Sequence, residues 1–280
     1  MKLHVINTGF FKLDGGAMFG VVPKVLWSRH QEPDENNLVN WAMRCLLIEK
    51  WDKLILIDTG MGNKQDEKFF KHYYPSGEDT LMGSIEKAGF TASDITDVIL
   101  THLHFDHCGG AVECNEKGDL VPAFPNATYW SEQSHWNWAV KPNDREKASF
   151  LKENFVPLQE AGVLKFVNEE TEIIPELSFV LAHGHTESML IPHIQYKDKT
   201  IVYMADLLPS PSHIPMPWVM GYDIRPLDTL REKEAFFEDA VAKKYILFYE
   251  HDAKIEAGTL KMTEKGYRAD RVGDLADFID

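Results

Sequence analysis

Short apolar runs alternate along the chain with longer stretches whose apolar residues recur at helical spacing. The short runs predict β-strands, and the longer stretches predict helices that bury one face. The predicted strands cover residues 2–7, 41–48, 54–58, 98–100, 127–130, 163–167, 177–182, 189–195 and 200–204, with 41–48 and 54–58 forming a hairpin. The predicted helices cover residues 79–88, a segment with Trp136 and Trp138, 145–154 and 227–243.

This order of elements predicts an α/β fold with two strand-rich stretches, each followed by helices. A four-layer αββα sandwich of two sheets covered by helices fits it. The chain has no linker, low-complexity tract or short repeat, and 280 residues can form one large domain, so we expect a single domain over 1–280. Residues 17–37 are too irregular for a core element. We interpret them either as one wall of an active site or as a loop packed over the core.

Four metal-capable side chains follow the apolar run 98–100, in the sequence Thr-His-Leu-His-Phe-Asp-His. A strand continuing to this point would place the imidazoles of His102 and His104 on one face, because side chains alternate along a strand. Asp106 and His107 come later, where a turn could direct them at a second ion. Such groups are costly to bury without a partner, so a metal site is favoured over a His-rich surface loop.

Three further metal-capable residues each follow an apolar, strand-like run. His185 follows Phe-Val-Leu-Ala-His-Gly, Asp206 follows Ile-Val-Tyr-Met-Ala, and His251 follows Ile-Leu-Phe-Tyr-Glu. Strand ends hold side chains rigidly and leave them accessible, which suits a functional site. Together with 102–107, these residues predict a metal site at the ends of several strands.

The His-x-His-x-Asp-His motif at 102–107, with the later His, Asp and His, resembles the metallo-β-lactamase superfamily of hydrolases. Residues 14–29 and 217–223 are similar to quorum-quenching lactonases, including those of the YtnP type. The resemblance implies two metal ions bridged by Asp206, with Asp58 hydrogen-bonded to a ligand imidazole. It assigns His102, His104 and His185 to one ion, and Asp106, His107 and His251 to the other.

The ligand types suit two divalent ions, Zn²⁺ first, with Fe, Mn or Co as alternatives. Two ions about 3.5–4 Å apart can share a hydroxide that attacks a carbonyl carbon. We therefore expect a hydrolase that opens the lactone ring of N-acyl-homoserine lactones, with Asp106 orienting the nucleophile and passing a proton to the leaving oxygen. Related lactonases have a tyrosine at the position of Pro209, and Tyr222 could supply that hydroxyl. An apolar wall for the acyl chain is expected from Met18, Phe19, Trp218 and Met220, which could equally be ordinary core.

Other functions stay open at this stage. The same metal pair could hydrolyse phosphotriesters or aryl esters, and a thioester hydrolase fits less well. A non-catalytic metal-binding protein is disfavoured, because every position of the ligand set is present. Around His185 the usual second histidine is replaced by Met189 and an additional His183 appears, so the surroundings of His185 are expected to differ from the superfamily pattern.

Charge and cysteine content narrow the partners. A net charge of −15 argues against nucleic acid and against an anionic membrane surface, which leaves a small-molecule substrate. Three cysteines, Cys45, Cys108 and Cys114, form no even set and indicate a reducing compartment. Residues 1–5 read as a strand and no apolar stretch approaches the roughly 20 residues of a membrane span, so we expect a cytoplasmic protein without a secretory leader. A homodimer is compatible with the sequence.

Overall fold

The protein, described by a computed structural model over residues 1–168 and 170–279, divides into two compact units. Unit 1 contains residues 1–10 and 43–171, and unit 2 contains residues 11–42 and 172–280. The unit boundary lies inside two long strands, β1 (Lys2–Asp14) and β2 (Leu38–Lys50). The first strand is therefore longer than predicted. The single domain expected from the sequence stays a prediction.

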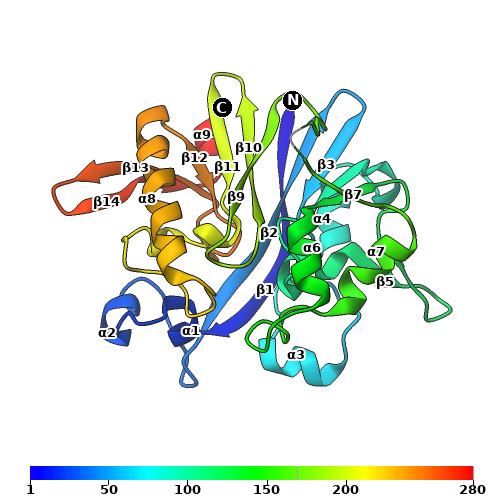
Figure 1. Cartoon of the computed structure of the whole chain (residues 1–280), viewed down its shortest axis with the longest axis horizontal. Helices are drawn as coiled ribbons and strands as arrows, with labels where there is room; N and C mark the ends of the chain where they lie inside the picture. Colours follow the sequence, from blue (N-terminus) through cyan, green and yellow to red (C-terminus); the bar gives the residue numbers. More distant parts are fainter. Residues whose placement is uncertain (169, 280) are drawn as a thin grey trace. The chain divides into compact units, whose positions relative to one another are not determined.

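Within the described residues, one mixed sheet has the strand order β1-β2-β3-β4-β7-β8 (Figure 1). β2 and β3 (Lys53–Ile57) form the predicted antiparallel hairpin, while the pairs β3–β4, β4–β7 and β7–β8 are parallel. The remaining strands of unit 1 are β4 (Asp97–Ile99), β7 (Thr128–Ser131) and β8 (Leu164–Phe166), with a separate ribbon of β5 (Val112–Cys114) and β6 (Leu120–Pro122). Its helices are α3 (Glu67–Tyr73), α4 (Leu81–Lys87), α5 (Phe105–Cys108), α6 (Gln133–Val140) and α7 (Val156–Glu160), with 3-10 turns at Ala92–Asp94, Gly109–Ala111 and Lys152–Asn154.

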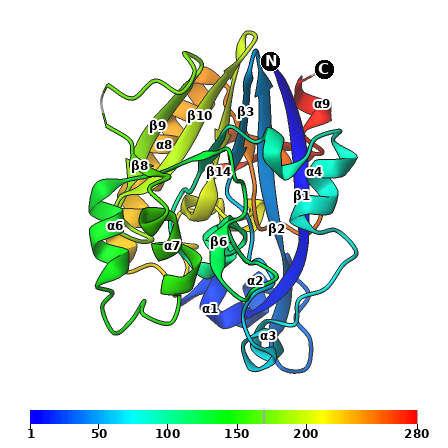
Figure 2. The ribbon, with the colours of Figure 1, turned by 90° about the vertical axis from the view of Figure 1, so that its right-hand side faces the viewer.

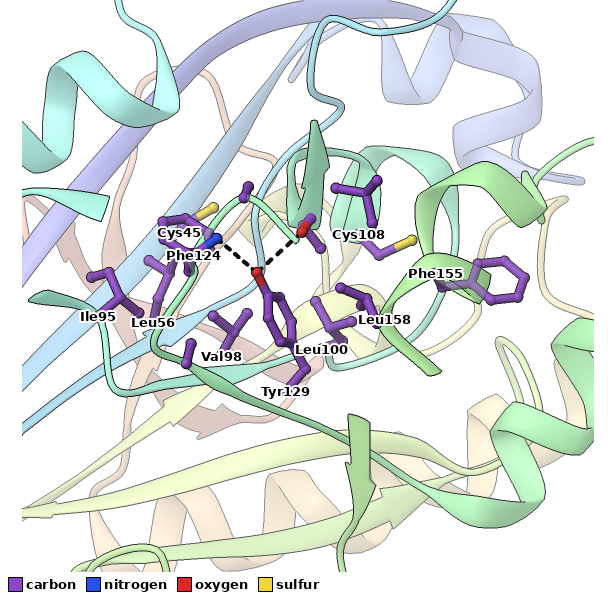
Figure 3. Packing of buried hydrophobic residues seen from close by; sticks show 14 of the residues in the cluster. Cys45, Leu56, Ile95, Val98, Leu100, Cys108, Phe124, Tyr129, Phe155 and Leu158 are labelled. Carbon is purple, nitrogen blue, oxygen red and sulfur yellow. Dashed lines mark hydrogen bonds between the residues drawn. The ribbon is translucent and has the colours of Figure 1, made fainter. Parts of the chain in front are cut away.

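The core of unit 1 forms where these helices bury their apolar faces against the sheet. Val98 from β4 and Leu158 from α7 lie in one buried cluster (Figure 3). Tyr129 is fully buried there, and its hydroxyl accepts from the Phe124 amide at 2.9 Å and donates to the Ala111 carbonyl at 3.1 Å. The polar end of this tyrosine is thereby satisfied, as a buried hydroxyl requires.

Unit 2 contains the second mixed sheet, in the order β14-β13-β12-β11-β10-β9. Only β11 and β12 pair in parallel within it. Figure 2 shows the long helix α8 (Pro226–Lys243) running along this sheet behind β9, where Phe236 meets His193 of β10 edge-on. The strands are β9 (Leu177–Ala182), β10 (Met189–Tyr196), β11 (Lys199–Tyr203), β12 (Ile246–Phe248), β13 (Ala257–Thr263) and β14 (Gly266–Gly273). The other helices are α1 (Gly15–Phe19), α2 (Lys24–Trp27) and α9 (Ala276–Ile279), with 3-10 turns at Ala205–Leu207 and Pro211–His213.

One local prediction fails. The expected helix over 145–154 is wrong: only Lys152–Asn154 forms a 3-10 turn. The Asn143 side chain accepts from the amides of Arg145 and Glu146, as a helix cap does, and its carbonyl accepts from the Lys147 amide at 3.0 Å, but the turn does not continue into a helix. After β1 the chain enters α1, because the Asp14 carboxylate caps this helix through the Ala17 amide. In the portion that the structure describes, no helix has the length and apolar character of a membrane span.

Candidate metal-binding site

In unit 1 the metal motif lies on a loop and a short helix. The expectation that a strand continues through His104 is wrong, because β4 ends at Ile99. The Asp58 carboxylate accepts from both the amide and the hydroxyl of Thr101, at 2.8 and 2.7 Å, and so replaces the strand partner that the chain would otherwise need. His102 and His104 still converge. Their ring centroids are 4.6 Å apart, and one donor atom of each lies within 4.8 Å of the other.

Asp58 also contacts the second pair of the motif. It follows β3 with a φ of 57° and is fully buried. Its Oδ2 lies 3.1 Å from His107 Nδ1, which fixes that nitrogen as the donor and leaves Nε2 for a ligand. Asp106 and His107 both lie on α5, and one donor atom of each lies within 4.8 Å of the other. Unit 1 therefore presents three imidazoles and one carboxylate from six consecutive positions, and all four residues are buried.

Glu146 is a neighbour of this motif that the sequence did not indicate. Its Oε1 lies 3.7 Å from His104 Nε2, and its Oε2 accepts from the indole of Trp138 at 2.7 Å. The residue belongs to the segment predicted as a helix, and no motif surrounds it. Only the chain path after α6 brings it back to His104.

In unit 2 the carboxylate of Asp206 lies between two imidazoles. His185 follows β9, Asp206 lies in the 3-10 turn after β11, and His251 follows β12. Asp206 Oδ2 is 3.0 Å from His185 Nε2, and Asp206 Oδ1 is 3.1 Å from His251 Nε2. Each Asp206 oxygen thus points at a different imidazole, which is the geometry of a carboxylate that can bridge two ions.

The outer nitrogens of these two imidazoles are fixed by hydrogen bonds. His185 Nδ1 lies 3.1 Å from Asp223 Oδ1, and His251 Nδ1 lies 2.8 Å from the Ala42 carbonyl oxygen. Because each Nδ1 faces an acceptor, it carries the proton and leaves Nε2 available to a metal. The sequence did not indicate Asp223 as a partner of His185. The only available signal was the resemblance of the segment 217–223 to lactonases.

Charge within the unit 2 cluster favours a bound cation. Burial alone lowers the pKa of His185, but the carboxylates of Asp206 and Asp223 outweigh it and raise the pKa to about 10. His185 therefore holds a proton beside Asp206 whenever no cation is bound. A metal ion supplies the same positive charge, so binding it releases this proton.

Cys108 follows the motif but lacks the properties of a ligand. Its side chain is fully buried, and burial raises the pKa of the thiol to about 12. A neutral thiol is a poor metal ligand at neutral pH. The donor set therefore consists of imidazoles and carboxylates, which suits zinc or a related first-row metal in a catalytic site.

Helix α8 supports the altered loop around His185. Glu232 accepts from the amides of His183 and Gly184, at 2.6 and 3.1 Å. Gly184 packs so tightly on the helix that a Cβ there would lie 2.3 Å from the Thr229 hydroxyl. Contacts with α8 therefore support the loop over 183–189, whose sequence differs from the superfamily pattern.

The residues expected to form an apolar wall are mostly core. Met18, Phe19 and Met220 are buried, with Phe19 stacked on Trp27 at 5.2 Å and on His213 at 4.6 Å. Trp218 is partly exposed and meets Phe19 edge-on at 5.8 Å. Tyr222 keeps 37% of its surface exposed. A role of these residues in substrate binding stays a prediction.

Known proteins are similar to this chain in sequence and in fold. The sequence profile of the metallo-beta-lactamase superfamily matches residues 44–251. An N-acyl homoserine lactonase from Bacillus cereus is 26% identical over 168 residues, which span 55% of this chain and 60% of the relative. One from Bacillus thuringiensis is 24% identical over 232 residues, spanning 78% and 84%.

Solved structures agree over nearly the whole length. A probable metal-dependent hydrolase from Staphylococcus aureus superimposes with a TM-score of 0.87 at 30% identity, covering 97% of this chain and 96% of that chain. A dizinc quorum-quenching lactonase, AidC, in complex with its product N-hexanoyl-L-homoserine, superimposes with a TM-score of 0.78 at 23% identity, covering 96% and 95%.

The chain belongs to the metallo-beta-lactamase superfamily. The predicted fold class is confirmed: two mixed sheets flanked by helices form the fold of this superfamily. Its clusters of buried His and Asp side chains are consistent with the two metal ions of a metallo-hydrolase.

Proposed function

We propose that this protein is a dinuclear metal-dependent lactonase that opens the ring of N-acyl-homoserine lactones. The observation that carries the proposal is the position of Asp206 between His185 and His251, with one carboxylate oxygen directed at each imidazole. Membership of the superfamily and the similarity to N-acyl homoserine lactonases support the substrate class. The YtnP-type branch within these lactonases stays a prediction.

The ligand set that we propose is the one that the resemblance to the superfamily implies. His102 and His104 with His185 would hold one ion, Asp106 and His107 with His251 would hold the other, and Asp206 would bridge them. The bound ions, zinc in the first instance, lower the pKa of a water molecule and polarise the substrate carbonyl. The substrate is a small lactone and the expected compartment is the cytoplasm. A homodimer stays possible within the proposal.

The chain's own residues would supply the proton transfers and the orientation of the substrate. Asp106 is 7% exposed, so its carboxylate can accept the proton of the attacking water and deliver it to the ring oxygen that leaves. The leaving alkoxide stays tethered to the product and needs only that one proton. Tyr222 would direct its hydroxyl at the lactone carbonyl, because Pro209 stands where related lactonases have a tyrosine.

The experiment measures proton release on N-butanoyl- and N-dodecanoyl-homoserine lactone with zinc-loaded protein, and it counts zinc per chain by mass spectrometry. His104→Ala tests the cluster of unit 1 and His251→Ala tests the cluster of unit 2. His72→Ala, an exposed histidine of α3, is the matched control. We expect two zinc ions per wild-type chain, and loss of turnover by at least about 100-fold in both ligand variants but not in the control.

Aryl esters and phosphotriesters serve as competing substrates. Turnover of either class above that of the lactones would replace the proposed substrate while keeping the metal site. Lactone turnover that survives in His251→Ala would contradict the proposed role of His251 as a metal ligand.

A further inference from the structure

Helix α8 carries a lysine whose charge is buried inside unit 2. Lys233 is 1% exposed, and its ammonium donates to the carbonyl oxygens of His213 at 2.7 Å and Trp218 at 2.9 Å. The carbonyls of Pro215 and Met216 are 3.3 and 3.4 Å away. All four carbonyls belong to residues 213–218, which we call the 213–218 loop.

The contacts of Lys233 are unusual for a buried cation. No ion pair joins it to a carboxylate within residues 1–168 and 170–279, the charge of Asp223 acts on it only at longer range, and its ammonium also lies 5.7 Å from the centre of the Phe237 ring. A buried charge without a paired countercharge is costly, so backbone dipoles must offset the cost. Burial lowers the pKa of Lys233 to about 7.

The loop needs these donors because its sequence limits backbone hydrogen bonding. Pro215 and Pro217 have no N–H group, and the segment forms neither strand nor α-helix. A carbonyl left unpaired in a buried loop costs about 1–3 kcal/mol. Lys233 donates to several carbonyls of the loop from one point, alongside the Trp218 amide, which donates to the Pro215 carbonyl at 2.9 Å, and thereby fixes the path of the loop.

The same loop forms one side of a cavity of about 790 Å³ in unit 2. Ile214, Pro215 and Trp218 line it, opposite Val272 and Arg268 of β14. A cavity of this size accommodates a small-molecule chain. Trp218 also lines a narrow crevice together with Asp206, Met220 and Lys233. Trp218 therefore lines both the larger cavity and the crevice that Asp206 also lines.

The loop is joined to the segment that carries the expected apolar wall. His213 Nε2 lies 2.9 Å from the Met18 carbonyl oxygen, and the Gly221 amide donates to Ala17 at 2.7 Å. A displacement of the loop would move Trp218 relative to Phe19, which it meets edge-on at 5.8 Å.

We propose that Lys233 is a positioning residue that fixes Trp218 through the 213–218 loop and so sets the acyl-chain selectivity of the enzyme. The inference rests on the proposed lactonase function. Lys233 acts through the loop and takes no part in the chemistry. A long acyl chain that extends past Trp218 into the cavity depends on the position of the indole, whereas a short chain does not reach it.

The test compares Lys233→Met, which keeps the length of the side chain and removes the nitrogen that donates to the loop, with Lys243→Met. Lys243 lies on the same helix, is exposed and pairs with Asp239. We measure kcat and KM for N-butanoyl- and N-dodecanoyl-homoserine lactone. Lys233→Met should raise KM for the dodecanoyl substrate about tenfold, with kcat and the butanoyl KM changed less than about threefold. Lys243→Met should behave like the wild type.

A double-mutant cycle with Trp218→Ala tests whether Lys233 acts through the indole. The effect of Lys233→Met on the dodecanoyl KM should largely disappear when Trp218 is already absent. Amide hydrogen exchange of residues 213–221 should speed up in Lys233→Met and not in Lys243→Met. This readout needs no turnover.

Each other outcome would overturn one identified step of the inference. An equal loss of kcat on both substrates, or additive effects in the cycle, would overturn the role in selectivity. Unchanged exchange would overturn the positioning of the loop. Failure of the wild type on every lactone would overturn the proposed function and the selectivity with it, and the exchange measurement would still decide the positioning.

Discussion

Replacing Asp223 by alanine removes two hydrogen bonds from the surroundings of His185. Asp223 is 2% exposed; its Oδ1 lies 3.1 Å from His185 Nδ1, and its Oδ2 accepts from the Met220 amide at 3.2 Å. Loss of such a partner of a metal-binding histidine lowers metal affinity by about 10–100-fold, or about 1.4–2.7 kcal/mol. Each buried donor left without an acceptor costs a further 1–3 kcal/mol or so of folding stability.

The assay for Asp223→Ala is zinc competition against a chelating dye, with stability of the metal-free protein followed by urea unfolding. Asp228→Ala is the control, because the side chain of Asp228 is 39% exposed and, among the described side chains, pairs only with Arg231. Asp223→Asn keeps an acceptor for His185 and should lose less than about tenfold in zinc affinity. A zinc dissociation constant of Asp223→Ala within twofold or so of the wild type would refute the role assigned to Asp223.

Three further predictions follow from the buried contacts. Gly184→Ala should lose about 1–3 kcal/mol of stability and bind zinc more weakly, because its Cβ would lie 2.4 Å from the backbone nitrogen of Thr229. If Thr229→Ala restored the stability of Gly184→Ala, a clash with the Thr229 backbone could not be the cause, because that clash would remain in the double variant. His135→Phe should cost about 1–3 kcal/mol in urea unfolding, because His135 Nε2 accepts from the buried Leu103 amide at 2.8 Å; an unchanged unfolding free energy would speak against it. Burial lowers the pKa of Lys233 from 10.5 to about 7, so between roughly pH 7 and 10 the lysine is protonated in the unfolded chain but not in the folded protein. The unfolding free energy of the wild type, relative to that of Lys233→Met, should therefore rise with pH by at most about 1.4 kcal/mol per pH unit in this range. A difference in unfolding free energy that does not change with pH would disprove the lowered pKa.

The strands that precede several candidate metal ligands could be predicted from the sequence. The apolar runs before His185, Asp206 and His251 correctly predicted β9, β11 and β12, because a buried strand needs a continuous apolar stretch and polar residues at its end. The hairpin of β2 and β3 and the long helix α8 were predicted for similar reasons. Each of these elements carries its own periodic signal.

Other predictions failed where a distant or local side chain competed with the regular pattern. β4 stops before His102 because Asp58, which follows a different strand, takes the hydrogen bonds of Thr101. In the segment predicted as a helix over 145–154, Asn143 caps a single turn that does not continue. Propensity is a weak guide where a side chain offers the backbone an alternative partner.

The sequence by itself determined the superfamily, the fold class and the residues able to bind metal, because these depend on side-chain chemistry and on periodic patterns along the chain. Only the tertiary structure decided which groups orient them. Asp223 beside His185, Glu146 beside His104 and Lys233 beneath the 213–218 loop belong to no motif. Their partners lie 38, 42 and 15–20 positions away, and hydrogen bonds over such separations are set by how the elements pack.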